Sequence, residues 1–169
     1  CTPIISEIHY DNAGADDGEF IEIMVPTGYD VSGLMINLYR STGTIYGTET
    51  VASGAMSQDG DADVYILDIS GIQNGPNGLA LSENGTLLEF ISYEGTVTAT
   101  EGPANPKTSV NIGVSESSST PIGFSLQRQS DDNWAGPQAE TRGAANFNTT
   151  IESCDFFPGA ITFITDDLI

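Results

Sequence analysis

The sequence predicts an all-β fold in which two sheets pack as a sandwich. Strand-sized apolar runs, rich in Ile, Val, Phe and Tyr, alternate with turn-forming clusters at intervals of about ten residues. No segment repeats apolar residues with the i, i+3, i+4, i+7 spacing of an amphipathic helix over three turns. Nineteen Gly and eight Pro, spread along the chain, are typical of many turns and short strands.

Residues 4–25, IISEIHYDNAGADDGEFIEIMV, predict the strand pair that nucleates the sandwich. Residues 4–10 and 20–25 are the two strands, and turn formers fill the stretch between them. Alternation along the first strand places His9 on the same face as Ile5 and Glu7. Glu7 and Glu22 stand mid-strand among apolar residues, so we expect one or both carboxylates to be partly buried and hydrogen-bonded.

The remaining strands follow in short runs. The dipeptide Asn84-Gly85 predicts a two-residue hairpin, because both positions tolerate positive φ. We expect a polar loop over 53–63 and a long irregular region over 94–120, anchored by Val97 and by residues 110–112. The predicted strands are 33–40, 44–52, 64–69, 79–81, 87–93 and 124–128.

Charge narrows the range of partners. Four Lys and Arg face 24 Asp and Glu, which gives a formal net charge of −20. Such a surface repels nucleic-acid phosphates and anionic lipid, and no run of 18 apolar residues is present that could enter a membrane. We therefore expect neither nucleic-acid binding nor membrane insertion, and an acidic surface suited to a saline exterior.

The two cysteines, Cys1 and Cys154, indicate an oxidising compartment. A chain that starts at Cys without Met has the form of a secreted protein after removal of a signal peptide, and we expect one Cys1–Cys154 disulfide. The alternative is a lipidated Cys1, which leaves Cys154 as a free thiol. Two sequons, at Asn84 and Asn148, are candidate glycosylation sites.

The sequence gives little support for a catalytic site. His9 is the only histidine of the chain, so no Ser-His-Asp triad can be built on another histidine. A zinc site needs more His or Cys ligands than the chain contains. We therefore favour a structural role for His9. The 24 acids yield carboxylate pairs by chance, without a cluster of Trp to stack a saccharide. We expect no enzyme activity.

The best metal candidate is the acidic loop with Asp59, Asp61 and Asp63. Alternating Asp residues in a flexible loop can bind Ca²⁺ through oxygen, but Val64 stands where the EF-hand pattern needs Gly. A solvated acidic loop is the alternative reading. The same two readings apply to a second acidic loop at residues 11–19.

Short motifs occur in order along the chain: ISEI at residues 5–8, EFIEI at 19–23 and VSGL at 31–34 near the start, and FSLQR at 124–128, Trp134 and TRGAAN at 141–146 near the end. These motifs resemble the opening strands and the ending of the lamin-tail domain family. Between them, NGLAL at 77–81 and LEFISYEG at 88–95 resemble the variant of that family found in secreted bacterial proteins. The family's final-turn Pro is Arg142 here, and its aromatic after "G" is Leu34. The resemblance implies an immunoglobulin-like sandwich with a binding or structural role and no shared catalytic residues.

The chain continues beyond this pattern. We assign residues 1–154 to the lamin-tail-like sandwich and 155–169 to a C-terminal strand or arm, since FFPGAITFIT at 156–165 is apolar and strand-like. This segment either folds back as an extra edge strand or adds to the sheet of a neighbouring subunit.

These observations predict a secreted structural module that associates with itself or with other extracellular proteins, as a subunit of a filament or surface assembly. One alternative is an accessory targeting domain of a secreted nuclease or phosphatase. Another is a module that binds glycans with the help of calcium.

Overall fold

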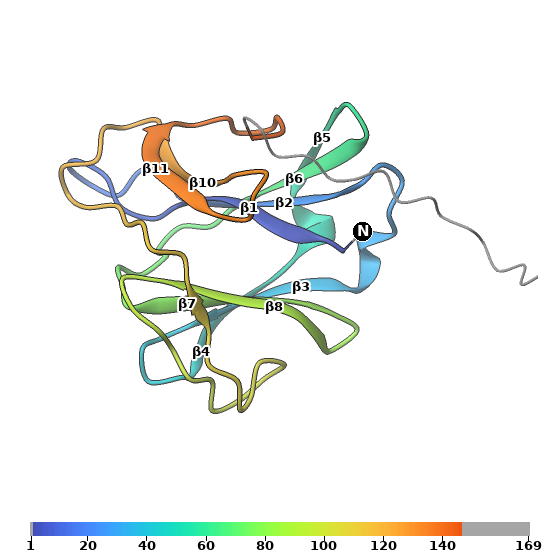
Figure 1. Cartoon of the computed structure of the whole chain (residues 1–169), viewed down its shortest axis with the longest axis horizontal. Helices are drawn as coiled ribbons and strands as arrows, with labels where there is room; N and C mark the ends of the chain where they lie inside the picture. Colours follow the sequence, from blue (N-terminus) through green and yellow to red (C-terminus); the bar gives the residue numbers. More distant parts are fainter. Residues whose placement is uncertain (1, 147–169) are drawn as a thin grey trace, which may run out of the picture.

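The computed structural model describes residues 2–146, and it confirms an all-β sandwich of the immunoglobulin-like type (Figure 1). The first sheet has the order β11-β10-β1-β2-β6-β5 and the second has the order β4-β3-β7-β8-β9. The strands of the first sheet are β1 (Ile4–His9), β2 (Phe20–Pro26), β5 (Ala55–Asp59), β6 (Ala62–Asp68), β10 (Phe124–Arg128) and β11 (Trp134–Ala139). Those of the second are β3 (Leu34–Tyr39), β4 (Ile45–Thr50), β7 (Asn77–Glu83), β8 (Thr86–Tyr93) and β9 (Val110–Asn111). Two 3₁₀ turns, η1 (Val31–Gly33) and η2 (Val51–Ser53), complete the elements.

The core lies between the sheets. Alternate residues of β2, β3 and β7 point inward, as a period of two requires, and the sandwich is filled mainly by Ile, Leu and Tyr. Tyr10 and Tyr93 stack with ring centroids 4.0 Å apart and are fully buried. Burial of so many large side chains supplies the main stabilisation of the fold.

The strand pair predicted for residues 4–25 is confirmed, with one correction. β1 and β2 pair antiparallel, and the register shifts between Ile5 and Glu7. The extra residue of this bulge turns Ile5 into the core with Ile8, whereas Glu7 and His9 lie on the outer face. The expectation that Ile5 shares a face with His9 was therefore wrong.

The predicted Asn84-Gly85 hairpin is confirmed. Asn84 has φ 48° and Gly85 has φ 80°, and β7 and β8 pair on either side of them. Two positive φ values in succession match the right-handed twist of the flanking strands.

Three strands were not predicted: the two-residue β9, which lies in the region expected to be irregular, and two longer edge strands. Residues 55–59 lie in the expected polar loop, yet they form β5 and pair with β6 from Ala55 to Asp59. β11 pairs with β10 from Trp134 to Ala139. Both are edge strands with mostly polar or small side chains, so their hydrophobic signal is weak.

Irregular segments cover the outer face of each sheet. Val97, Ala99 and Ala104, from the long region 94–120, pack on Tyr39 and Phe90 of the second sheet. Residues 140–146 run over the first sheet, where Ala145 packs on Met24 and Val64 (Figure 1). Part of each broad face of the sandwich is thus covered by the chain itself.

Several predictions fall outside the described residues. They are the Cys1–Cys154 disulfide, the sequon at Asn148 and the C-terminal strand over 155–169.

Candidate docking groove

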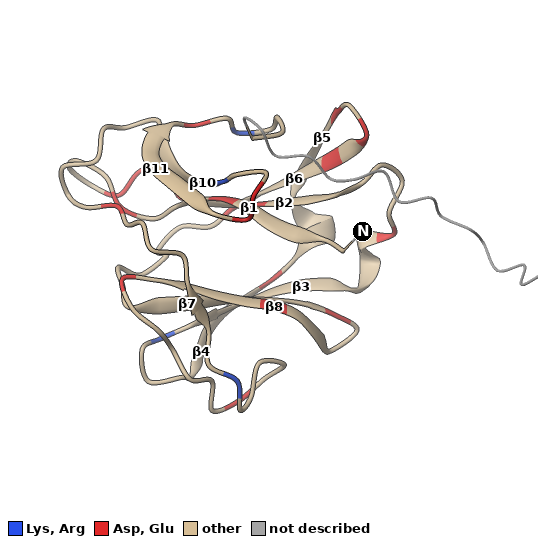
Figure 2. Ribbon diagram, viewed as in Figure 1, with Lys and Arg blue, Asp and Glu red and all other residues tan. Residues whose placement is uncertain are grey.

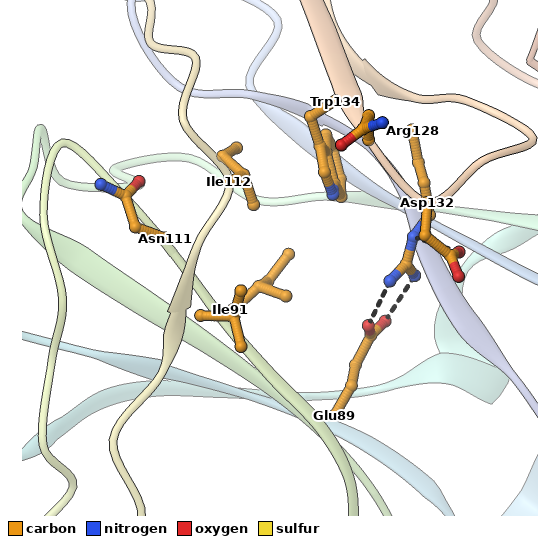
Figure 3. Close-up of a pocket in the computed structure, with 9 residues that line it drawn as sticks. Glu89, Ile91, Asn111, Ile112, Arg128, Asp132 and Trp134 are labelled. Carbon is orange, nitrogen blue, oxygen red and sulfur yellow. Dashed lines mark hydrogen bonds and ion pairs between the residues drawn. The ribbon is translucent and has the colours of Figure 1, made fainter.

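A groove of about 320 Å³ opens at one side of the sandwich, between β8 and β9 of one sheet and β10 and β11 of the other (Figure 3). We call it the inter-sheet groove. Its apolar part comes from Ile91, Ile112 and Trp134. Figure 3 shows these three side chains around a common hollow. The volume and mixed lining are in the range of sites that take a side chain or small ligand.

An ion pair closes the polar end of the groove. Nη2 of Arg128 lies 3.0 Å from Oε2 of Glu89, and the two side chains are only 12% and 16% exposed. Oε1 of Glu89 also accepts a hydrogen bond from the backbone N–H of Ile5. The pair therefore ties β8 of one sheet to β10 and β1 of the other.

Arg128 makes two electrostatic contacts at this end of the groove. Burial raises the pKa of Glu89, and the charge of Arg128 opposes that rise. The Arg128 guanidinium also lies 5.9 Å from the centroid of the Trp134 ring, within cation–π range. Because Arg128 is held from two sides, it fixes the indole as one wall of the groove.

The backbone beside the groove is open. β9 pairs with β8 only at Ile91 and Ser92, and the bond from the N–H of Ile112 to the carbonyl of Ser92 extends that contact by one residue. Within residues 2–146 no strand pairs with this edge of β8 over residues 86–90. Such an edge can accept a further strand.

No known protein family matches. Comparisons with family models, with curated proteins and with solved structures all returned no match for this chain. The resemblance to lamin-tail domains therefore remains a prediction.

The structure places the acidic loop at the β5–β6 hairpin, without converging its carboxylates. Oδ2 of Asp59 accepts the N–H of Ala145 and Oδ2 of Asp63 accepts the N–H of Gly28, each at 2.8 Å. Asp61 is exposed at the tip. Among the described residues, no group of three or more Asp, Glu, His or Cys side chains is arranged to hold a metal ion.

The sequon residue Asn84 is exposed at the β7–β8 hairpin. Its backbone N–H donates to the carbonyl of Gly33, and its side chain lies against Gly33. Glycosylation at this position stays a prediction.

No helix within residues 2–146 is long and apolar enough to span a membrane.

Glu7 and Glu22 are fully buried, as expected, and hold the segment that ends the described chain. Ser125 Oγ and the N–H of Thr141 donate to Oε1 of Glu7, at 2.6 and 3.0 Å. The N–H of Gly143 donates to Oε2 of Glu22 at 2.8 Å. We call this arrangement the carboxylate clasp, since two carboxylates of β1 and β2 retain residues 141–146.

Burial perturbs both acids of the carboxylate clasp. Burial, followed by the charge of neighbouring Glu7, raises the pKa of Glu22 to about 8. Burial also raises the pKa of Glu7, although hydrogen bonds from Ser125 and Thr141 act against it. Both side chains are fully buried and accept hydrogen bonds from the clasped segment, which gives them a structural role.

His9 is bound to the long irregular region. Its Nδ1 lies 2.9 Å from Oε1 of Glu116, whose other oxygen accepts the backbone N–H groups of Tyr10 and Asp11. Burial lowers the pKa of His9, but the hydrogen bond and charge of Glu116 outweigh burial and raise it. This ion pair anchors residue 116 to the end of β1, in line with the structural role favoured for His9.

Sequence reasoning did not find the inter-sheet groove. Trp134 and Arg128 were noted only as parts of a family-like motif, and Glu89 only as a strand residue. The sequence did contain one signal for the groove. The single Trp lies near Arg128, which is one of only four cationic side chains in a chain with 24 acids (Figure 2).

Proposed function

We propose that this chain is a secreted, non-catalytic structural module of the lamin-tail type, which assembles outside the cell by β-strand addition between copies. One observation carries the proposal: the inter-sheet groove lies beside an edge of β8 that has no partner over residues 86–90 within the described chain.

Strand addition uses both parts of this site. The open backbone of β8 offers N–H and C=O groups to an incoming strand, and these bonds supply affinity without regard to sequence. The apolar hollow formed by Ile91, Ile112 and Trp134 takes side chains from one face of that strand and supplies specificity.

Charge sets the conditions for assembly. Copies that each carry a formal charge of −20 repel one another at low ionic strength. Salt at about 0.15 M shortens the screening length to about 8 Å, which leaves the contacts in the groove intact but weakens the long-range repulsion. We therefore expect assembly in saline conditions and dissociation at low ionic strength, as suits an extracellular module.

The test is electron microscopy of untagged native material, with light scattering on the same sample at low and at physiological salt. Regular filaments or sheets that form as salt is raised support the proposal. A monodisperse species near 17.8 kDa at every salt and protein concentration overturns it.

Glycan binding is the second candidate, and Trp134 favours it. The indole lines the groove together with Asn111, Asp132 and Asn133, and an aromatic wall with polar neighbours is a common saccharide-binding arrangement. Quenching or enhancement of Trp134 fluorescence by oligosaccharides, with no assembly under any condition, is the result that favours this candidate.

A further inference from the structure

Resting on the proposed function, we propose that the occupant of the inter-sheet groove is the C-terminal segment of a second copy, with residues 160–165 paired to the open edge of β8. Ile161 and Phe163 then enter the hollow between the sheets.

The acceptor requires a short, uncharged, extended donor. The open edge covers residues 86–90 of β8, so it offers pairing to about five or six residues. Three charged groups line the groove: Glu89 and Arg128 pair at its buried polar end, and Nε of Arg128 also lies 3.4 Å from Oδ1 of the exposed Asp132. A charged donor side chain placed there would lose its hydration without gaining a partner.

Residues 156–165 meet these requirements in sequence. This stretch of ten residues carries no charge, in a chain with 24 Asp and Glu. Pro158 has no N–H to donate, so a continuous ladder begins after it and ends before Asp166. Alternation places Ile161 and Phe163 on the same side of the strand.

The described chain ends on the outer face of the first sheet. Nδ2 of Asn146 donates to the carbonyls of Ser6 and Arg128, and Ala145 packs with Met24 on the outer face of the first sheet. The inter-sheet groove lies on the inner side of that sheet, between the two layers (Figure 3). The last described residue, Asn146, thus lies on the outer face of the first sheet and bonds to the backbone of Arg128, whose side chain lines the groove.

The connecting chain is long enough to reach a neighbour. Residues 147–159 span at most about 45 Å when extended, which exceeds the thickness of two sheets packed about 10 Å apart and suffices for a neighbour's groove as well as for the chain's own. A donor at one face and an acceptor at another form a head-to-tail contact, and repetition of that contact yields a linear polymer when its rotation does not close into a ring.

The experiment uses the full chain with two tail substitutions, Ile161→Asp and Phe163→Asp, which remove the donor and leave the groove unchanged. Trp134 is the only tryptophan of the chain and lines the groove, so its fluorescence reports occupancy. We titrate this variant with a synthetic peptide of residues 156–167, which contains no tryptophan, and with a scrambled peptide of the same composition.

We expect saturable binding of the peptide with a change in Trp134 emission, and no response to the scrambled peptide. Ile112→Asp in the groove should weaken peptide binding at least about tenfold, as loss of an apolar contact implies. The control Ile122→Asp introduces the same change at a side chain that is 68% exposed and lies outside the groove, and it should bind as before. Near-ultraviolet circular dichroism of each variant shows whether the fold is retained.

The two proposals fail in distinguishable ways. If the native chain assembles and the tail variant assembles equally well, the donor is wrong and the structural function stands. If the peptide binds as expected but the native chain never assembles, the groove is assigned correctly and the structural function is wrong. A native monomer whose Trp134 is already shielded by its own tail overturns docking between copies.

Discussion

The carboxylate clasp makes the stability of this domain depend on pH, with a sign opposite to that of ordinary surface acids. Each pKa unit corresponds to about 1.36 kcal/mol, so a rise for Glu22 from 4.5 to about 8 corresponds to about 5 kcal/mol. The folded state binds this proton more tightly than the unfolded state does. The stabilisation is therefore fully present below pH 4.5 and is lost as the pH rises through about 8.

The perturbation that isolates this effect is Glu22→Gln. Glutamine keeps the shape of the protonated side chain, so we expect the free energy of unfolding at pH 5 to change by about 1 kcal/mol or less. At pH 9 the variant should exceed the wild type by several kcal/mol. The gain cannot be larger than the free energy needed to undock residues 141–146, because the wild type can relieve the buried charge by releasing that segment.

Urea unfolding followed by Trp134 fluorescence between pH 5 and pH 9 measures the difference. Asp61→Asn is the matched control, since it removes one exposed carboxylate and changes the net charge by the same amount. If Glu22→Gln and Asp61→Asn show the same pH slope, the reasoning about the clasp is refuted and general charge repulsion accounts for the slope.

Three further predictions concern other parts of the structure. Arg128→Met should destabilise by about 3–5 kcal/mol because it leaves Glu89 buried without its partner, whereas the double change with Glu89→Leu should recover most of that loss in a urea-unfolding cycle. Gly102→Ala should lower the melting temperature more than Gly85→Ala, although both have positive φ, because a Cβ at 102 meets Ile45 at 2.5 Å and a Cβ at 85 meets nothing within 4 Å. Millimolar Ca²⁺ should raise the melting temperature no more than Mg²⁺ at equal ionic strength, since the carboxylates of the β5–β6 hairpin do not converge; a clear excess for Ca²⁺ contradicts this.

Periodicity and turn chemistry were sufficient for the central strands. The run at residues 20–25 and the Asn84-Gly85 dipeptide carry strong local signals, and the structure confirms both. The burial of Glu7 and Glu22 also followed from position, since a residue in the middle of a central strand has little access to water.

The features that the sequence did not predict have physical causes beyond the local sequence. A single inserted residue in β1 reverses which face Ile5 occupies, and nothing in the residue types marks that bulge. β5 and β11 are strands because a neighbour offers them an open edge, not because their own residues prefer one. The inter-sheet groove depends on Glu89 meeting Arg128 across 39 positions of sequence, which no local pattern encodes.

The partial covering of both broad faces has a geometric consequence. Tyr39 and Phe90 on one side, and Met24 and Val64 on the other, already lie beneath the chain's own irregular segments. A further molecule cannot stack flat on either sheet without displacing those segments and exposing the side chains under them. The rims of the sheets are then the places where growth costs least, so an object built from this domain should lengthen as a thread and resist thickening into a bundle.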